Sequence, residues 1–331
     1  MCRFVMYLGE PINLDTLLTK PINSLINQSY DAEERNPLNG DGFGVAWYVP
    51  EISPEPAVFK AETPAWNNRN LLHLARATRS ECVLAHVRAA SPGMPVMETN
   101  CHPFLSGNFA FMHNGVVGGF HTIRKPLLAS LSDASFHVVE GSTDSEHLFA
   151  LFLDCWQAAK KKGPLEAMAD ALEHMIERVL TLQHDHGITA ESQLNLAISD
   201  GKRAVATRYT TGDPQKATTL YWHEGRRYVY KDGVGFMVDP DVRSDTVIIA
   251  SEPLSEDTGW EPVAPNTMVL VQENRKVQLR SLPALAAAPP LRRRDASSGG
   301  ASAARSLGVT ARRAKVSTRK TRQGTRPVSA R

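Results

Sequence analysis

The second residue, Cys2, opens an apolar run with the composition of a β-strand, Met1-Cys2-Arg3-Phe4-Val5-Met6-Tyr7-Leu8-Gly9. If the initiator methionine is removed, a free α-amine and a thiol belong to the same residue. An unperturbed α-amine titrates at about 7.7 to 8.0 and a thiol at about 8.5, so the amine can take the thiol proton near neutral pH. A nucleophile with its own base can carry out covalent acyl transfer. Because most second-position cysteines are incidental, other residues must support this interpretation.

A second polar segment, His113-Asn114-Gly115, follows a predicted strand at Phe109–Met112. From local sequence alone, the Asn-Gly step favours a hairpin turn.

A third segment, Thr143-Asp144-Ser145-Glu146, precedes an apolar run and matches a capping box. The pattern predicts that a helix begins there and continues to about Lys161. Asp144 would lie in the first turn of this helix, where unpaired backbone N–H groups favour a carboxylate. A carboxylate fixed in this way can hold a cation.

Other ligand-binding patterns are missing from the sequence. The turn-rich segment Asn36–Gly44 has neither of the glycine spacings of phosphate-binding loops, GxxxxGK[ST] and GxGxxG, so no nucleotide site is predicted. The 11 histidines give no metal-ligand spacing. The 4 cysteines show no paired CxxC spacing, so neither a zinc ribbon nor a disulfide framework is expected.

Length and composition indicate a globular protein of enzyme size. The chain has 331 residues, of which 42% are hydrophobic, enough to bury a sizeable core. No apolar stretch approaches the roughly 18 residues of a membrane span, and the N-terminus lacks the pattern of a signal peptide. We therefore expect a cytoplasmic protein without membrane contact.

The order of the predicted elements indicates the fold class. Strands come first, two helices follow at about residues 143–161 and 164–183, and strand patterns return from Gln193 onward. Strands and helices in separate runs favour an α+β layered domain with largely antiparallel sheets over a doubly wound one. We expect one domain over residues 2–283.

The last part of the chain differs in composition from the rest. Residues 284–331 contain 12 Lys and Arg residues against the single Asp295, whereas residues 1–283 contain 25 Lys and Arg against 34 Asp and Glu. Its Ala, Pro, Arg, Ser and Gly content cannot bury a core, so we expect a disordered basic tail. We favour a solvated extension, with contact to nucleic acid or another polyanion as the alternative.

Five segments, taken in order, resemble the glutaminase domain of class II (N-terminal nucleophile) glutamine amidotransferases. They are Met1–Phe4, Asn39–Gly44, His86–Ala90, Asn100–Phe104 with Phe111–Gly115, and Ser142–Glu146. The sequence is most similar to the stand-alone branch that includes the amidotransferase-like subunit of the alternative glutathione-degradation pathway, and less similar to the γ-glutamyl hydrolase of ergothioneine synthesis. The likeness to the stand-alone branch extends to Ser24–Ser29, Thr63–Asn68 and Ala250–Leu254. It covers roughly residues 1–280 and none of the tail.

The resemblance implies a four-layer αββα sandwich of the Ntn-hydrolase type and a role for each matched residue. Cys2 would be the nucleophile and its freed amine the base. Asn114 would give its side-chain amide, and Gly115 its backbone N–H, to an oxyanion hole. Arg88 would bind the α-carboxylate of a glutamyl group, and Asp144 its α-ammonium. These roles suit the chemistry, since arginine offers a planar fork to a carboxylate and preorganised donors stabilise an oxyanion.

The resemblance implies neither a metal nor a cofactor. Because the amine already serves as the base, we assign His102 and His113 to packing and hydrogen bonding. The expected reaction is hydrolysis of a γ-glutamyl amide, in glutamine or a compound such as glutathione, through a thioester on Cys2. Its substrate would be a small molecule.

Two alternatives remain for the function. Residues 150–283 are expected to complete the sandwich, which leaves no domain to accept ammonia. The chain could instead supply ammonia to a separate protein partner, or it could be a catalytically silent subunit that binds γ-glutamyl groups. The intact set of matched residues argues against the silent subunit.

Overall fold

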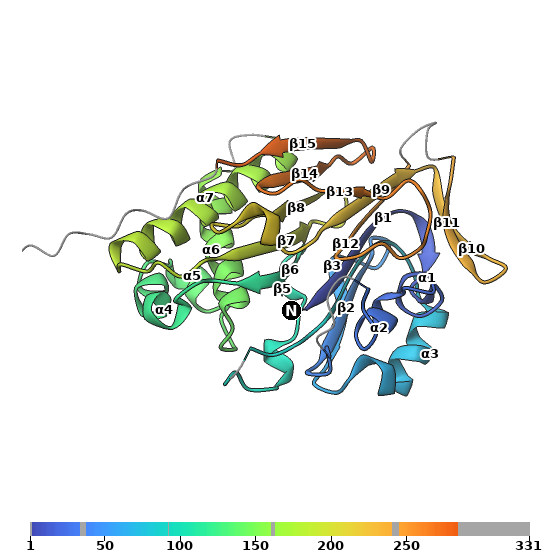
Figure 1. Cartoon of the computed structure of the whole chain (residues 1–331), viewed down its shortest axis with the longest axis horizontal. Helices are drawn as coiled ribbons and strands as arrows, with labels where there is room; N and C mark the ends of the chain where they lie inside the picture. The colour runs from blue at the N-terminus through green and yellow to red at the C-terminus, as the bar shows by residue number, and fades with distance from the viewer. Residues whose placement is uncertain (1, 34–37, 92, 160–162, 240–244, 284–331) are drawn as a thin grey trace, which may run out of the picture. The chain divides into compact units, whose positions relative to one another are not determined.

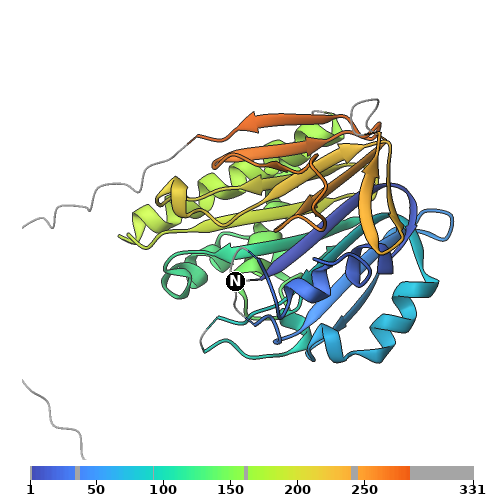
Figure 2. The same ribbon diagram turned by 45° about the vertical axis from the view of Figure 1, so that its right-hand side comes forward.

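The computed structural model describes residues 2–33, 38–91, 93–159, 163–239 and 245–283. Two antiparallel sheets face each other, and helices cover the outer side of each sheet (Figure 1 and Figure 2). The predicted α+β class and the four-layer αββα sandwich are therefore confirmed. The predicted disordered tail, residues 284–331, lies outside the described residues, as does Met1.

The first sheet has seven strands in the order β13-β9-β12-β1-β4-β2-β3, and every neighbouring pair is antiparallel. Its strands are β1 (Arg3–Asn13), β2 (Phe43–Val49), β3 (Ser53–Ala61), β4 (Arg79–Val87), β9 (Tyr221–Gly225), β12 (Thr246–Ala250) and β13 (Glu261–Pro262). The first strand of the chain is central, between β12 and β4. Cys2 therefore directly precedes a strand that is hydrogen-bonded on both sides.

The second sheet has six strands in the order β15-β14-β8-β7-β6-β5, again antiparallel. Its strands are β5 (Phe104–Ser106), β6 (Phe109–Val116), β7 (Gln193–Ser199), β8 (Ala204–Arg208), β14 (Thr267–Val271) and β15 (Val277–Ser281). A separate hairpin consists of β10 (Arg227–Lys231) and β11 (Val234–Val238).

The hairpin turn that local sequence favours at Asn114-Gly115 is wrong. Strand β6 continues through both residues, with Asn114 opposite Asn195 and Gly115 opposite Leu194 of β7. Pairing with β7 thus overrides the local turn preference. Glycine at position 115 allows the close approach of the neighbouring backbone, because a Cβ there would lie 1.8 Å from the carbonyl oxygen of Gln193.

The helices form the two outer layers. On the six-stranded sheet lie α4 (Phe120–Ala129), α6 (Asp144–Ala159) and α7 (Pro164–Asp185), with α5 (Asp133–Phe136) against α6. On the seven-stranded sheet lie α1 (Asp15–Leu18), α2 (Leu25–Gln28) and α3 (Arg69–Ala77). The two helices predicted in the middle of the chain are α6 and α7. No described helix combines the length and the apolar character needed to span a bilayer.

Strand alternation brings the predicted site residues together. The inner faces of three strands pack between the sheets through Phe4, Met6 and Leu8 of β1, Cys82 and Leu84 of β4, and Ala110 and Met112 of β6. Because every second residue shares a face, Cys2, Arg88 and Asn114 continue these inner faces. Arg3 pairs with Val87, so the start of β1 lies beside the end of β4. The three residues therefore lie at one end of the sandwich.

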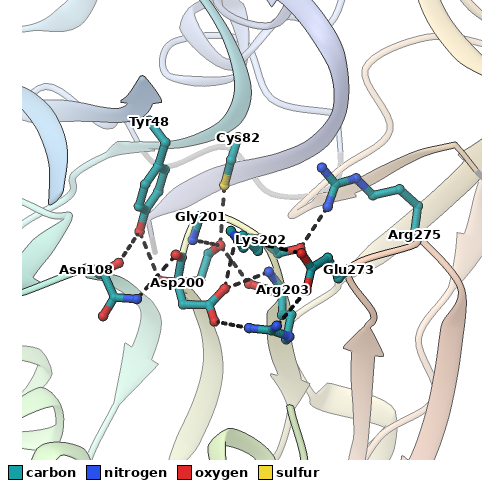
Figure 3. A network of polar contacts seen from close by, with 10 residues as sticks. Tyr48, Cys82, Asn108, Asp200, Gly201, Lys202, Arg203, Glu273 and Arg275 are labelled. Atoms are coloured by element: carbon teal, nitrogen blue, oxygen red, sulfur yellow. Dashed lines mark hydrogen bonds and ion pairs between the residues drawn. The ribbon is translucent and has the colours of Figure 1, made fainter. Parts of the chain in front are cut away.

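The opposite end of the sandwich is closed by a network of polar contacts (Figure 3). The hydroxyl of Tyr48 on β2 donates to the carbonyl oxygen of Ser199 at 3.0 Å, and the Cys82 sulfur lies 3.3 Å from the Ser199 hydroxyl. Asp200, in the turn after β7, pairs with Arg203 at 2.8 Å. The contacts of Ser199 tie the seven-stranded sheet to the six-stranded one, away from Cys2.

Candidate active site

The Cys2 thiol lies against the backbone of Ala89, just beyond the end of β4. The Ala89 N–H donates to the sulfur at 3.4 Å, and the thiol donates to the Ala89 carbonyl at 3.6 Å. Burial raises the pKa of the Cys2 thiol, while the Ala89 N–H and the charge of Arg88 lower it and Asp144 raises it further. The raised pKa keeps the thiol protonated near neutral pH, so a nearby base must activate it.

Arg88 is a buried cation whose side chain is held by carbonyl groups. The residue is 3% exposed, and its guanidinium donates to the carbonyl oxygens of Asp41 at 3.2 Å and Pro95 at 3.3 Å. No carboxylate pairs with Arg88 in the part of the chain that the structure describes. A buried charge without a counter-ion is costly, so this position suits an anionic ligand.

Asp41 supports the segment that carries Arg88 and was not among the predicted site residues. Its backbone N–H donates to the Arg88 carbonyl at 3.0 Å, and its carboxylate accepts from the Ala90 N–H at 2.8 Å. Asp41 belongs to the matched segment Asn39–Gly44, so the sequence contained the signal. Its role could not be assigned because the contacts join the segment before β2 to the segment after β4, which are far apart in the sequence.

Asp144 is the first residue of α6, as the capping pattern predicts. One carboxylate oxygen accepts from the Val117 N–H at 2.8 Å, and the other accepts from the Ser145 N–H at 2.8 Å. The carboxylate is thus fixed against the turn that follows β6, two residues beyond Gly115. A carboxylate can accept about four hydrogen bonds, so it retains the capacity to bind a cation.

Asn114 has an unusual side chain for a buried residue. The residue is 0% exposed, yet neither its amide nitrogen nor its amide oxygen has a hydrogen-bond partner. Buried amides are normally paired, and leaving one unpaired costs about 1 to 3 kcal/mol. An unpaired amide at the end of the sandwich where Cys2 and Arg88 lie is therefore suited to bind a ligand.

Three buried histidines lie behind these residues. His86 and His102 stack with ring centroids 4.1 Å apart, and burial lowers the pKa of both, to about 3 for His86. His113 Nε2 lies 3.1 Å from the carbonyl oxygen of Gln193 and therefore carries the proton, while Nδ1 lies 2.9 Å from the Ser145 hydroxyl. His113 has the hydrogen-bonding contacts expected for it, whereas His102 is held by ring contacts, and neither of its ring nitrogens has a hydrogen-bond partner among the described residues. None of the three touches the Cys2 sulfur in the contacts of the described residues.

Comparison with known proteins gives the family. The family model for class-II glutamine amidotransferases matches residues 24–294. The chain is 39% identical to the probable glutamine amidotransferase DUG3 of Saccharomyces cerevisiae, covering 82% of each chain. It is 27% identical to the gamma-glutamyl-hercynylcysteine sulfoxide hydrolase of Mycolicibacterium smegmatis, covering 82% of this chain and 96% of that one.

A solved structure agrees with the sequence matches. A glutamine aminotransferase class-II domain protein from Silicibacter pomeroyi superposes with a TM-score of 0.59 at 28% identity, covering 85% of this chain and 99% of that chain. The chain therefore belongs to the class-II glutamine amidotransferases, and it is an enzyme. The family model match begins after Cys2 and does not include this cysteine.

Proposed function

We propose that the enzyme hydrolyses the γ-amide bond of glutamine, or of another γ-glutamyl compound such as glutathione, with Cys2 as its nucleophile. The observation that carries the proposal is the Asn114 amide, which is fully buried without a partner for either polar atom. Asn114 continues the inner face of β6, and Cys2 continues the inner face of β1 in the other sheet, at the same end of the sandwich. An amide N–H at this point can stabilise the oxyanion that forms when a thiolate attacks a carbonyl.

Removal of Met1 matures the enzyme once, because it frees the α-amine of Cys2. The reaction with substrate follows. The amine takes the thiol proton, and the thiolate attacks the γ-carbonyl carbon to give a tetrahedral oxyanion. The α-ammonium of Cys2 then protonates the leaving nitrogen as the C–N bond breaks, which leaves a γ-glutamyl thioester on the Cys2 sulfur. Water attacks the thioester with the Cys2 amine as base, the C–S bond breaks, and the Cys2 ammonium returns the proton to the sulfur. Glutamate is released, and the thiol is regenerated on Cys2.

Two kinds of contact support this chemistry. Asn114 Nδ2 and the Gly115 backbone N–H stabilise the oxyanion. Arg88 binds the α-carboxylate through its planar fork, and Asp144 binds the α-ammonium. The buried guanidinium of Arg88, which has no counter-ion among the described residues, gains its ion pair when substrate binds.

The names of the relatives describe two substrates, glutamine and γ-glutamyl-hercynylcysteine sulfoxide. Both share the γ-glutamyl head group and differ in what leaves. A site that holds both charged ends of the head group reads the shared part. We therefore assign the substrate class as γ-glutamyl amides and leave the group beyond the scissile bond variable.

A second candidate function is supply of ammonia to a separate acceptor protein. The name of the relative at 39% identity, a probable glutamine amidotransferase, favours it. The chemistry at Cys2 is the same for both candidates. The two candidates differ in their dependence on an acceptor protein. For an ammonia-supplying enzyme, ammonia release from glutamine should depend on the acceptor protein. For a hydrolase, hydrolysis of γ-glutamyl peptides should not.

A substrate panel tests the proposal. Release should occur from glutamine and from at least one γ-glutamyl peptide, because the head-group contacts are common to them. Asparagine, one methylene shorter, and α-glutamyl peptides should react at least about 100-fold more slowly, since a displacement of about 1 Å at the reacting carbonyl costs that much. The measurement is kcat/KM by ammonia or amine release. Comparable rates for α-linked and γ-linked glutamyl peptides would contradict the assignment of Arg88 and Asp144.

A further inference from the structure

A buried ion pair lies directly behind the proposed nucleophile. Arg3 is 2% exposed and Glu252 is 0% exposed, and one carboxylate oxygen of Glu252 accepts from Arg3 Nε at 2.7 Å and from Nη2 at 2.6 Å. The remaining terminal nitrogen, Nη1, donates to the carbonyl oxygen of Cys2 at 3.0 Å. The guanidinium thus connects Glu252 to the backbone of the residue that carries both the thiol and the amine.

The same segment also fixes the next residue of β1. Strand β12 ends at Ala250, which pairs with Val5, and Ser251 then continues the pairing in a different way. The Ser251 N–H donates to the Phe4 carbonyl at 3.0 Å, and the Phe4 N–H donates to the Ser251 hydroxyl at 3.0 Å. Residues 250–252 therefore hold β1 from Val5 back to Cys2.

The second carboxylate oxygen of Glu252 extends this connection to another segment. It accepts from the backbone N–H of Glu33 at 2.9 Å. Glu33 precedes the matched segment Asn39–Gly44, in which Asp41 supports Arg88. Glu252 thus connects Arg3, at the start of β1, with the backbone of Glu33.

A buried ion pair by itself adds little stability, because the cost of removing two charges from water offsets their attraction. The geometry of this pair offers more than stability. A fixed guanidinium restrains the Cys2 carbonyl, and the amine on the same residue must reach its own thiol. At a chain end, which otherwise tends to fray, such a restraint keeps the amine and the sulfur in a reactive arrangement.

We propose that Glu252, acting through Arg3, is a positioning residue that holds the Cys2 backbone in its reactive geometry and balances the positive charge beside the α-amine. This inference rests on the proposed function, since it requires that Cys2 react. The charged groups that face Cys2 among the described residues are Arg88 from β4, Asp144 from α6 and the Arg3–Glu252 pair. Of these, only the pair contacts the backbone of Cys2 itself.

The first test is Glu252→Gln, which keeps the shape of the side chain and removes its charge. The charge beside the amine then becomes more positive by one unit, and added positive charge at this range disfavours the protonated amine. We expect kcat/KM to fall by about 100-fold, as for a misplaced reacting group. We also expect the acidic limb of its pH profile to move down by about one pH unit.

Two further variants separate charge from position. Arg3→Lys keeps the positive charge but loses the fork that reaches Glu252 and the Cys2 carbonyl together, so kcat should fall while the acidic limb stays in place. The double variant Arg3→Gln with Glu252→Gln removes both charges, so its limb should return to the wild-type position while kcat stays low. Removing both partners avoids an unpaired buried charge, so this variant carries the test if Glu252→Gln fails to fold.

The matched control is Asp200→Asn at the opposite end of the sandwich (Figure 3). It breaks a half-buried ion pair with Arg203 at 2.8 Å. We expect it to lower the Tm while leaving kcat/KM and the pH profile of the folded enzyme unchanged. A shift of the acidic limb in Asp200→Asn would overturn the inference. It would show that a loss of stability at a distant position is enough to shift the pH profile of kcat/KM.

The inference is overturned if folded Glu252→Gln, or the folded double variant, keeps wild-type kcat/KM and an unshifted limb while only the Tm falls. That outcome leaves the proposed function intact, provided that turnover in the same assay is lost in Cys2→Ala. If Cys2→Ala retains turnover, the proposed function itself fails. The two failures are thus distinguished within one set of measurements.

Discussion

Replacement of Cys2 by alanine is expected to lower kcat/KM for γ-glutamyl amides by about 10⁴- to 10⁶-fold, the range seen when a covalent nucleophile is removed. Without the thiol no thioester can form, and water must attack the amide directly. The rest of the site remains, so substrate binding should persist. The measurement is turnover of glutamine and a γ-glutamyl peptide together with thermal unfolding.

The folded structure should tolerate this change. The Cys2 residue is half-buried, and the hydrogen bonds of its thiol among the described residues are to the backbone of Ala89, at 3.4 and 3.6 Å. We expect the free energy of unfolding to change by less than about 1 kcal/mol. Cys155→Ala is the matched control, because it removes a buried thiol from α6 in the helical layer and should leave turnover unchanged. Full activity in Cys2→Ala would contradict the account.

The second large effect is expected at the head-group contacts. Arg88→Gln and Asp144→Asn should each lower kcat/KM for glutamine by about 30-fold or more. The reason is that the loss of one partner of a desolvated charge pair costs about 2 to 5 kcal/mol, and each 1.36 kcal/mol is about tenfold in rate. The effect should fall on kcat/KM for every γ-glutamyl substrate alike, because the head group is common to them.

Each of these variants has a control on the same element. Arg79→Gln lies at the other end of β4, where the arginine donates to the Pro11 carbonyl at 2.7 Å. Asp154→Asn removes a carboxylate of α6 that accepts from the Ser132 hydroxyl and pairs with Arg178 at 3.8 Å. Both controls should change stability and leave kcat/KM within a few-fold of the wild type. Near-wild-type kcat/KM in Arg88→Gln and Asp144→Asn would show that the head group is held elsewhere.

The start of α6 could be predicted from sequence because its signals are local. The Glu146 N–H donates to the Thr143 hydroxyl at 3.3 Å, which is one half of the predicted capping box. The other half differs, since the Glu146 carboxylate accepts from the backbone N–H groups of Glu140 at 2.9 Å and Gly141 at 2.7 Å. In the predicted capping box the Glu146 carboxylate would accept from the Thr143 N–H. Here it instead binds the backbone of the segment before the helix.

The hairpin β10–β11 is absent from the sequence predictions although a local signal for it exists. Asp232-Gly233 separates two strand-like runs, and both residues have positive φ, 53° and 89°. This is the conformation that favours Asp-Gly in two-residue hairpin turns. At Asn114-Gly115 the same kind of signal predicted a turn that does not form, because β6 pairs with the distant strand β7 through both residues.

The groups that surround Cys2 could be predicted only in part. Resemblance assigned roles to Arg88 and Asp144, and strand alternation explains why Cys2 and Arg88 share one end of the sandwich. The contacts of Glu252 with Arg3 span 249 residues and have no local signature. Backbone donors such as the Val117 N–H are invisible in a sequence because every residue other than proline has one.

The three remaining cysteines provide an internal comparison for the reactivity of Cys2. All three are buried, and burial raises the thiol pKa of Cys82 to about 12, of Cys101 to about 11, and that of Cys155 above its usual value. Thiolates are the reactive form, so these side chains should be inert toward a substrate-like electrophile. None of them has an adjacent α-amine.

The central claim is tested most directly by treating the active enzyme with a diazo-ketone analogue of glutamine and measuring the intact mass and the modified peptide. The account predicts a chain that begins at Cys2 and carries a single adduct on this residue, with loss of activity in proportion to labelling. A fully active enzyme that retains Met1, or an adduct on Cys82, Cys101 or Cys155 with Cys2 unmodified, would contradict it.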